Sequence, residues 1–161
     1  MMQQLTIMRH GEALFDAPDP QRTLSARGHQ QAAETAHWLS LRWAGHPVRM
    51  MASPYRRAQQ TALYLSDALG IPIETCSWLQ PDTPLLEVIA GWDTHWMDAG
   101  QEQRWIWVSH MPLVGRLSRY FVDGEKRGYG DIFGTAEAIL YEADVWAAGC
   151  VNMRDRYQPH V

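Results

Sequence analysis

The sequence is short of lysine, cysteine and net charge, and it contains no long apolar run. Lys126 is the only lysine among 14 basic residues, the formal net charge is −4, and there are two cysteines. Two cysteines do not form the disulfide framework of a small secreted domain, and an acidic balance argues against a basic nucleic-acid groove. No run is long enough to span a bilayer, and no signal peptide is recognisable. We therefore expect a cytoplasmic protein that binds neither nucleic acid nor membrane.

The length and composition are those of one globular domain. The chain has 161 residues, of which 46% are hydrophobic and 20% are charged. That length supports one sizeable core, and the proportions are ordinary for a soluble protein. We find no internal repeat, linker or low-complexity segment, so we expect a single domain over residues 1–161.

Predicted strands and helices alternate along the chain. Ala32, Ala36 and Leu39 share one face of a helix that Ser25 caps and Gly45 ends. The predicted strands are residues 5–8, 48–52, 71–76, 104–110, 136–143 and 149–154, and further helices are predicted to start at Ser53–Pro54, Pro84 and Pro112. Such alternation is typical of a mostly parallel sheet with helices on both faces, and the last two strands suggest an antiparallel edge.

Three of the predicted strands end in polar residues just before a helix. Arg9, His10 and Gly11 follow the first strand, Arg57 lies in "SPYRRAQQT" after the second, and His110 ends "RWIWVSH". The carboxyl ends of parallel strands line the ligand crevice of an α/β sheet. These segments, distant in sequence, are therefore expected to meet.

The chemistry of such a meeting favours a phosphoryl group. Two histidines and at least two arginines beside helix N-termini make an electropositive pocket. A neutral imidazole of His10 could attack phosphorus, while arginines neutralise the equatorial oxygens. Taken singly, His10 and His110 are typical of structural histidines and Arg57 of a surface cation, so the hypothesis depends on their convergence.

No metal or cofactor is expected. The sequence has no Cys/His spacing of a zinc site and no acidic cluster suited to magnesium. Asp16 and Asp19 are conceivable metal ligands, but aspartate beside proline is more typical of a turn. The pocket would therefore supply its own positive charge.

At these segments the sequence resembles the histidine phosphatase superfamily, whose hallmark is Arg-His-Gly after the first strand. "RTLSARGHQQA", "SPYRRAQQTA" and "SHMPLVG" resemble three further family segments, and the match runs from near residue 5 to about 117. Within the superfamily the chain looks most like the SixA-type phosphohistidine phosphatases. The resemblance implies a three-layer α/β/α sandwich of the phosphoglycerate mutase-like type. It also implies His10 as nucleophile, with Arg9, Arg57 and His110 as catalytic residues that bind the phosphate.

The substrate and the general acid stay open at this stage. Larger relatives use a carboxylic acid, and the nearest candidate along the chain is Glu87, which is equally well explained as a solvated helix residue. A weak acid suits a P–N bond better than an ester, and short connections suggest an open pocket. We expect hydrolysis of phosphohistidine on a phosphorelay or phosphocarrier protein, with inorganic phosphate as product. The alternatives are a phosphomonoesterase for a small sugar or nucleotide phosphate, and a phosphate-binding module without turnover.

Overall fold

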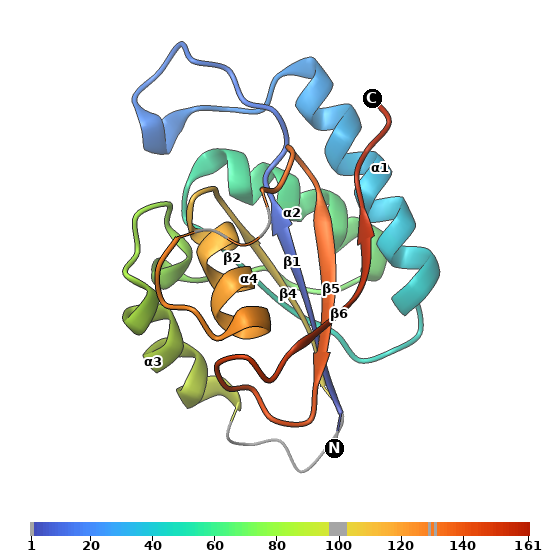
Figure 1. Ribbon diagram of the computed structural model, residues 1–161. Helices are drawn as coiled ribbons and strands as arrows, with labels where there is room; N and C mark the ends of the chain where they lie inside the picture. The colour runs from blue at the N-terminus through green and yellow to red at the C-terminus, as the bar shows by residue number, and fades with distance from the viewer. Residues whose placement is uncertain (1, 97–102, 129, 131) are drawn as a thin grey trace.

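The described part of the chain forms a six-stranded sheet with helices on both faces (Figure 1). The computed structural model describes residues 2–96, 103–128, 130 and 132–161. In chain order its main elements are β1 (Gln3–Arg9), α1 (Ala26–Trp43), β2 (Arg49–Ala52), α2 (Arg56–Leu69), β3 (Glu74–Thr75), α3 (Leu85–Trp96), β4 (Arg104–Ser109), α4 (Leu113–Asp123), β5 (Ala138–Ala143) and β6 (Asn152–Tyr157). No helix in these described residues is long and apolar enough to cross a membrane.

The sheet is parallel at one side and antiparallel at the other. Its strand order is β3-β2-β4-β1-β5-β6. β1 and β2 both pair in parallel with β4, and β3 pairs in parallel with β2. β5 is antiparallel to both β1 and β6. The predicted mostly parallel sheet with an antiparallel edge is therefore confirmed.

Alternating side chains divide the core into two layers. On β4, Trp105 and Trp107 pack into the cluster that includes α3 and α4. Ile106 and Val108 point to the opposite face and pack against α1 and α2. All four are fully buried, and each such side chain stabilises the fold by roughly 1.5–3 kcal/mol. These two layers on either side of the sheet confirm the predicted three-layer α/β/α sandwich.

The helix ends follow the predicted capping residues with one exception. Ser25 caps α1, because its side chain accepts a hydrogen bond from the backbone N–H of Gly28. Gly70 ends α2 in the left-handed conformation, with φ of 66°. The start of α2 was predicted at Ser53–Pro54, but the helix begins at Arg56. The hydroxyl of Ser53 instead bonds groups outside the helix, as described below.

Two of the predicted strands differ from the observed ones. The segment predicted as strand 71–76 contributes only β3, at the edge of the sheet beside β2. β6 runs three residues later than predicted, because Val151 N donates to Phe121 O and Cys150 N donates to Ala147 O. These bonds form a turn over the end of α4, and the strand begins only after it.

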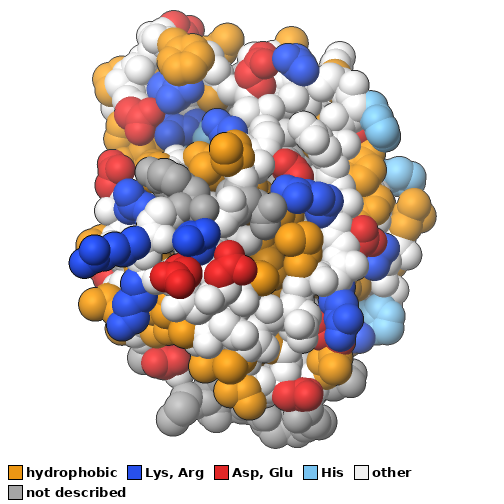
Figure 2. Space-filling model, viewed as in Figure 1, with side chains coloured by type: hydrophobic (Ala, Val, Ile, Leu, Met, Phe, Trp, Pro, Cys, Tyr) orange, Lys and Arg blue, Asp and Glu red, His pale blue; other side chains and the backbone are white. Residues whose placement is uncertain are grey.

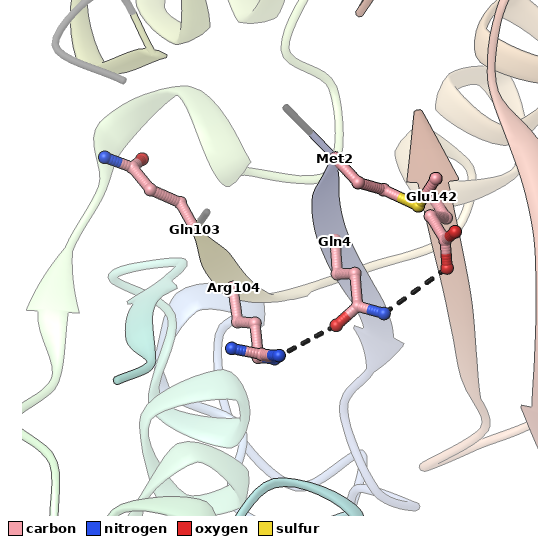
Figure 3. A pocket seen from close by; sticks show the side chains of 5 residues that line it. All are labelled: Met2, Gln4, Gln103, Arg104 and Glu142. Atoms are coloured by element: carbon pink, nitrogen blue, oxygen red, sulfur yellow. Dashed lines mark hydrogen bonds between the residues drawn. The ribbon is translucent and has the colours of Figure 1, made fainter. Parts of the chain in front are cut away.

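The amino ends of β1 and β4 border a polar hollow that is lined by Met2, Gln4, Gln103, Arg104 and Glu142 (Figure 3). Arg104 Nε donates to Gln4 Oε1 over 3.1 Å, and Gln4 Nε2 donates to Glu142 Oε2 over 3.3 Å. The three side chains stand opposite one another on adjacent strands. Their polar groups satisfy each other across the sheet, at the end opposite to the strand termini that carry His10 and His110.

Candidate functional site

The predicted meeting point lies at the carboxyl ends of β1, β2 and β4, at the top of Figure 1. Past the strands, His10 N donates to Ser109 O and Ser53 N donates to Val108 O, both over 3.0 Å. These bonds extend the sheet pairing by one residue and bring His10, Ser53 and His110 together. The His10 and His110 rings have centroids 5.0 Å apart, and the two residues are 6% and 1% exposed. Figure 2 shows several Lys and Arg side chains gathered below the loop at the top of the view.

The hydrogen bonds of His10 define its tautomer. Its Nδ1 lies 2.7 Å from the carbonyl oxygen of Gly11, and this oxygen can only accept. Its Nε2 lies 3.1 Å from Nε of Arg57, which can only donate. His10 is therefore a neutral imidazole with the proton on Nδ1 and a lone pair on Nε2. That lone pair is the one a nucleophile needs.

Gly11 is required by packing against the start of α1. A Cβ at Gly11 would lie 2.6 Å from the carbonyl oxygen of Gly28. A residue with a Cβ would therefore push the turn after His10 away from the start of α1. Gly11 N also donates to Thr61 Oγ1 over 3.0 Å, and Thr61 Oγ1 donates to Arg57 O over 2.8 Å. A single hydroxyl thus joins the turn after His10 to the helix that carries Arg57.

The segment "LSARGHQQA" holds the same turn from the other side. A Cβ at Gly28 would lie 2.0 Å from Glu12 O, so only glycine allows this approach. Gln31 Oε1 accepts from Glu12 N over 2.9 Å, and Ser25 Oγ donates to Glu12 Oε1 over 2.8 Å. The sequence predicted a helix start here. It did not predict that Ser25 and Gln31, at the start of this helix, would hold Glu12 by hydrogen bonds.

Arg57 is oriented by Asp19, for which the sequence favoured a turn over a metal ligand. Its Nη1 donates to the backbone oxygen of Asp19 over 2.6 Å, and its Nη2 lies 3.4 Å from Asp19 Oδ2. Arg22 binds the other carboxylate oxygen of Asp19 over 3.0 Å. Burial raises the pKa of Asp19, but the Arg22 hydrogen bond and the Arg57 charge outweigh it and leave the pKa lowered. Asp19 therefore stays ionised and anchors a cation beside His10.

Arg9 and His110 each keep one buried nitrogen without a partner. Arg9 Nη1 donates to Phe133 O over 2.8 Å, and His110 Nε2 lies 2.7 Å from Ser53 Oγ. Arg9 Nε and His110 Nδ1 are buried and have no hydrogen-bond partner among the described residues. A buried polar group without a partner costs about 1–3 kcal/mol, so the site favours a ligand that supplies acceptors. A tetrahedral oxyanion has such acceptors.

Burial and the arginines keep both imidazoles neutral. Burial, joined by the charges of Arg57, Arg9 and Arg22 and opposed by the bond to Gly11, lowers the pKa of His10 to about 3. Burial likewise lowers the pKa of His110 to about 2, together with His10 and the same arginines. Arg22 was missed as a site residue, although the quoted segment "RTLSARGHQQA" begins with it, because arginine at the start of that segment is also typical of a surface cation.

Glu87 lies outside this hydrogen-bonded cluster. It is an exposed residue in the first turn of α3, and it lines a hollow that Tyr55 also lines. In the described part of the chain, no hydrogen bond joins Glu87 to His10 or to His110. In that same part of the chain no three His, Cys, Asp or Glu side chains are grouped so as to hold a metal ion.

The chain is similar to known phosphatases in sequence and in structure. The model of the histidine phosphatase superfamily (branch 1) matches residues 5–80. Phosphohistidine phosphatase SixA of Escherichia coli (strain K12) is 33% identical over 128 residues, which is 76% of each chain. The solved structure of the protein histidine phosphatase SixA complexed with tungstate is 28% identical. It superposes with a TM-score of 0.80, over 97% of both chains.

A more distant structure shares the fold alone. A mycobacterial glucosyl-3-phosphoglycerate phosphatase superposes with a TM-score of 0.70 at 15% identity, covering 99% of this chain and all of its own. The same fold is therefore found in a protein named for phosphohistidine and in one named for a sugar phosphate.

Proposed function

This chain belongs to the histidine phosphatase superfamily, and from that premise we propose that it is a metal-independent phosphohistidine phosphatase. Its substrate would be a phosphohistidine on a phosphorelay or phosphocarrier protein, and its product inorganic phosphate. We further propose that residues 1–161 act as one catalytic domain, because the site draws on residues from Arg9 to Phe133.

The observation that carries the proposal is the bonding of His10. Nδ1 is held by Gly11 O at 2.7 Å, and Nε2 presents its lone pair to Arg57 Nε at 3.1 Å. A phosphoryl oxygen that enters the site would take the N–H of Arg57 and free Nε2 for attack. With the pKa of His10 lowered to about 3 by burial, the imidazole is already neutral at pH 7 and needs no base.

Two displacements complete the proposed reaction. His10 Nε2 attacks phosphorus, the P–N bond to the substrate histidine breaks, and its electron pair returns to the substrate imidazole, which takes a proton. Water then attacks the phosphorylated His10, its P–N bond breaks, and phosphate leaves. Arg9, Arg57 and His110 would bind the phosphoryl oxygens, where charge spreads in the transition state. As Nε2 becomes phosphorylated, Gly11 O would stabilise the positive charge on the ring.

The preference for a P–N bond has two supports. The relative that is 33% identical is named a phosphohistidine phosphatase, and the structure with a TM-score of 0.80 is that of a protein histidine phosphatase. Glu87 is exposed rather than buried beside His10, so a strong general acid is not built into the site. Protonated imidazole leaves readily, whereas an alkoxide requires an acid.

Glu87 also motivates the second candidate, a phosphomonoesterase for a small sugar or nucleotide phosphate. Glu87 lines a hollow together with Tyr55, whose ring lies 5.0 Å from that of His110. If Glu87 protonates an alcohol there, Glu87→Gln would abolish activity on esters. On our proposal the same change leaves phosphohistidine hydrolysis within about threefold of the parent enzyme, because no alkoxide must depart.

The test is turnover on a defined phosphoprotein. A histidine phosphocarrier protein phosphorylated with phosphoramidate is incubated with the enzyme in the presence of EDTA, and phosphate release is measured. We expect release that EDTA does not slow. Absence of release would contradict the proposal, and binding of the phosphoprotein without release would favour the phosphate-binding module.

A further inference from the structure

Next to the candidate phosphate site lies a second, separate hollow of about 280 Å³. It is formed by the segment before α3, by the first turn of α3 and by the residue that caps α2. Its lining residues are Tyr55, Ser77, Gln80, Asp82, Thr83 and Glu87.

Tyr55 is the wall that the hollow shares with the phosphate site. Its ring meets that of His110 edge-on at 5.0 Å, and the guanidinium carbon of Arg57 lies 5.1 Å from its centroid. The His110 ring lies in turn 5.0 Å from that of His10. A substrate whose phosphoryl group is on His10 therefore has its neighbouring side chains beside this hollow.

The polar groups of the hollow are available to a ligand. Asp82 and Glu87 are exposed, and neither carboxylate has a hydrogen bond or ion pair with any described residue. Thr83 is 7% exposed, lines the hollow, and its hydroxyl likewise has no partner in the described part of the chain. A largely buried threonine that presents an unpartnered hydroxyl to the hollow, beside two unpaired carboxylates, points to a hydrogen-bond donor of positive charge.

The charges of the two sites are opposite. Arg9 and Arg57 make the phosphate site cationic, whereas Asp82 and Glu87 make the hollow anionic. We propose that this hollow binds a lysine or arginine of the substrate protein, one helical turn from the phosphohistidine. Residues four apart on a helix have Cβ atoms about 5–6 Å apart, and a long basic side chain extends that reach across Tyr55. The inference rests on the proposed function and names a feature of its substrate.

The test uses alanine-based helical peptides that carry a stable phosphonate analogue of phosphohistidine. Lysine, alanine or glutamate is placed four residues after the analogue, and a second series places it four residues before. Binding of each fluorescently labelled peptide is measured by anisotropy at low ionic strength. In one of the two series we expect the lysine peptide to bind about fivefold more tightly than the alanine peptide, and the glutamate peptide more weakly.

The double variant Asp82→Asn/Glu87→Gln removes the anionic charge of the hollow. We expect it to lose the preference for lysine while it binds the alanine peptide like the parent protein. The control Asp67→Asn/Asp144→Asn removes two exposed carboxylates elsewhere and should keep the preference. A preference that survives in the first variant, or that the control loses equally, overturns the inference.

Failure of the inference is distinct from failure of the proposed function. If all the peptides bind equally to the parent protein, the hollow does not bind a basic side chain, but the proposed phosphohistidine phosphatase function is not contradicted. If no phosphonate peptide binds, the site does not accept phosphohistidine, and both fall.

Discussion

Arg57 donates a hydrogen bond from Nε to Nε2 of His10 over 3.1 Å, while its Nη1 is held by the backbone of Asp19. The same nitrogen of His10 that would attack phosphorus thus already faces the cation that would neutralise the phosphoryl oxygens. Because Nδ1 bonds Gly11 O, the imidazole cannot rotate or change tautomer without losing both bonds. The predictions below test this arrangement.

His10→Asn should abolish turnover without unfolding the protein. An amide lacks the nucleophilic lone pair of imidazole, so we expect kcat to fall by at least about 10³-fold. Phosphate release from the phosphorylated carrier protein measures the loss, and circular dichroism checks the fold. His37→Asn changes an exposed histidine and should retain full activity. Substantial turnover by His10→Asn would exclude His10 as the nucleophile.

Thr61→Val should lower activity through the position of His10 rather than through chemistry. The hydroxyl of Thr61 accepts from Gly11 N and donates to Arg57 O, and valine leaves Gly11 N buried without a partner. A loss of about 1–3 kcal/mol corresponds to a fall of about five- to 150-fold in kcat/KM, if the turn shifts to recover a bond.

Thr61→Ser is the matched control for that prediction. Serine keeps the hydroxyl, and we expect kcat/KM within about threefold of the parent enzyme. Equal losses for valine and serine would show that the methyl group, and not the hydroxyl, is responsible.

Gly28→Ala should destabilise the fold. A Cβ at this position would lie 2.0 Å from Glu12 O, which is backbone and cannot move alone. We expect a loss of about 1–3 kcal/mol in the free energy of unfolding, measured with urea. Gln30→Ala, at an exposed position of the same helix, should change it by less than about 0.5 kcal/mol. Unchanged stability of Gly28→Ala would contradict the close approach of the two segments.

The buried histidines should make stability depend on pH. Burial lowers the pKa of His10 from 6.5 to about 3 and that of His110 to about 2, so below pH 6.5 the unfolded chain binds protons that the folded chain does not. The free energy of unfolding should therefore fall as the pH decreases from about 6.5 towards 3, by about 1.4 kcal/mol per pH unit for each histidine.

Urea unfolding between pH 7.5 and 4, in buffers without phosphate, measures this dependence. His10→Asn removes one of the two groups and should reduce the slope by about half, whereas His37→Asn should not reduce it. An unchanged slope in His10→Asn would show that His10 is not neutral in the folded protein at these pH values.

The sequence allowed the fold and the meeting of the strand ends to be predicted, because caps, strand composition and helical periodicity are local. Ser25 acts as a helix cap as predicted, and the two layers of side chains on β4 follow from alternation. Contacts between segments that are far apart in the sequence cannot be predicted from such local patterns. The support of Arg57 by Asp19 joins residues 38 positions apart, and nothing in the composition of either segment indicates it.

The start of α2 shows how the site overrides a local signal. Ser-Pro is a typical helix start, but Ser53 Oγ bonds His110 Nε2 and accepts from Tyr55 N. The hydroxyl is therefore used in the site and the helix begins later. Glu87 is a case in which the sequence suggested a role that the structure does not support. Its place in the chain suggested a general acid, but its side chain is exposed rather than buried beside His10.

The most direct measurement is to trap the phosphorylated enzyme and locate the phosphoryl group. The enzyme is mixed with ³²P-labelled phosphocarrier protein, quenched in alkali within milliseconds, and digested for mass spectrometry, while ³¹P–¹⁵N NMR assigns the bonded nitrogen. We predict no more than one phosphoryl group per chain, on His10 and through Nε2. A phosphoryl group on another residue, or on Nδ1 of His10, would contradict the account.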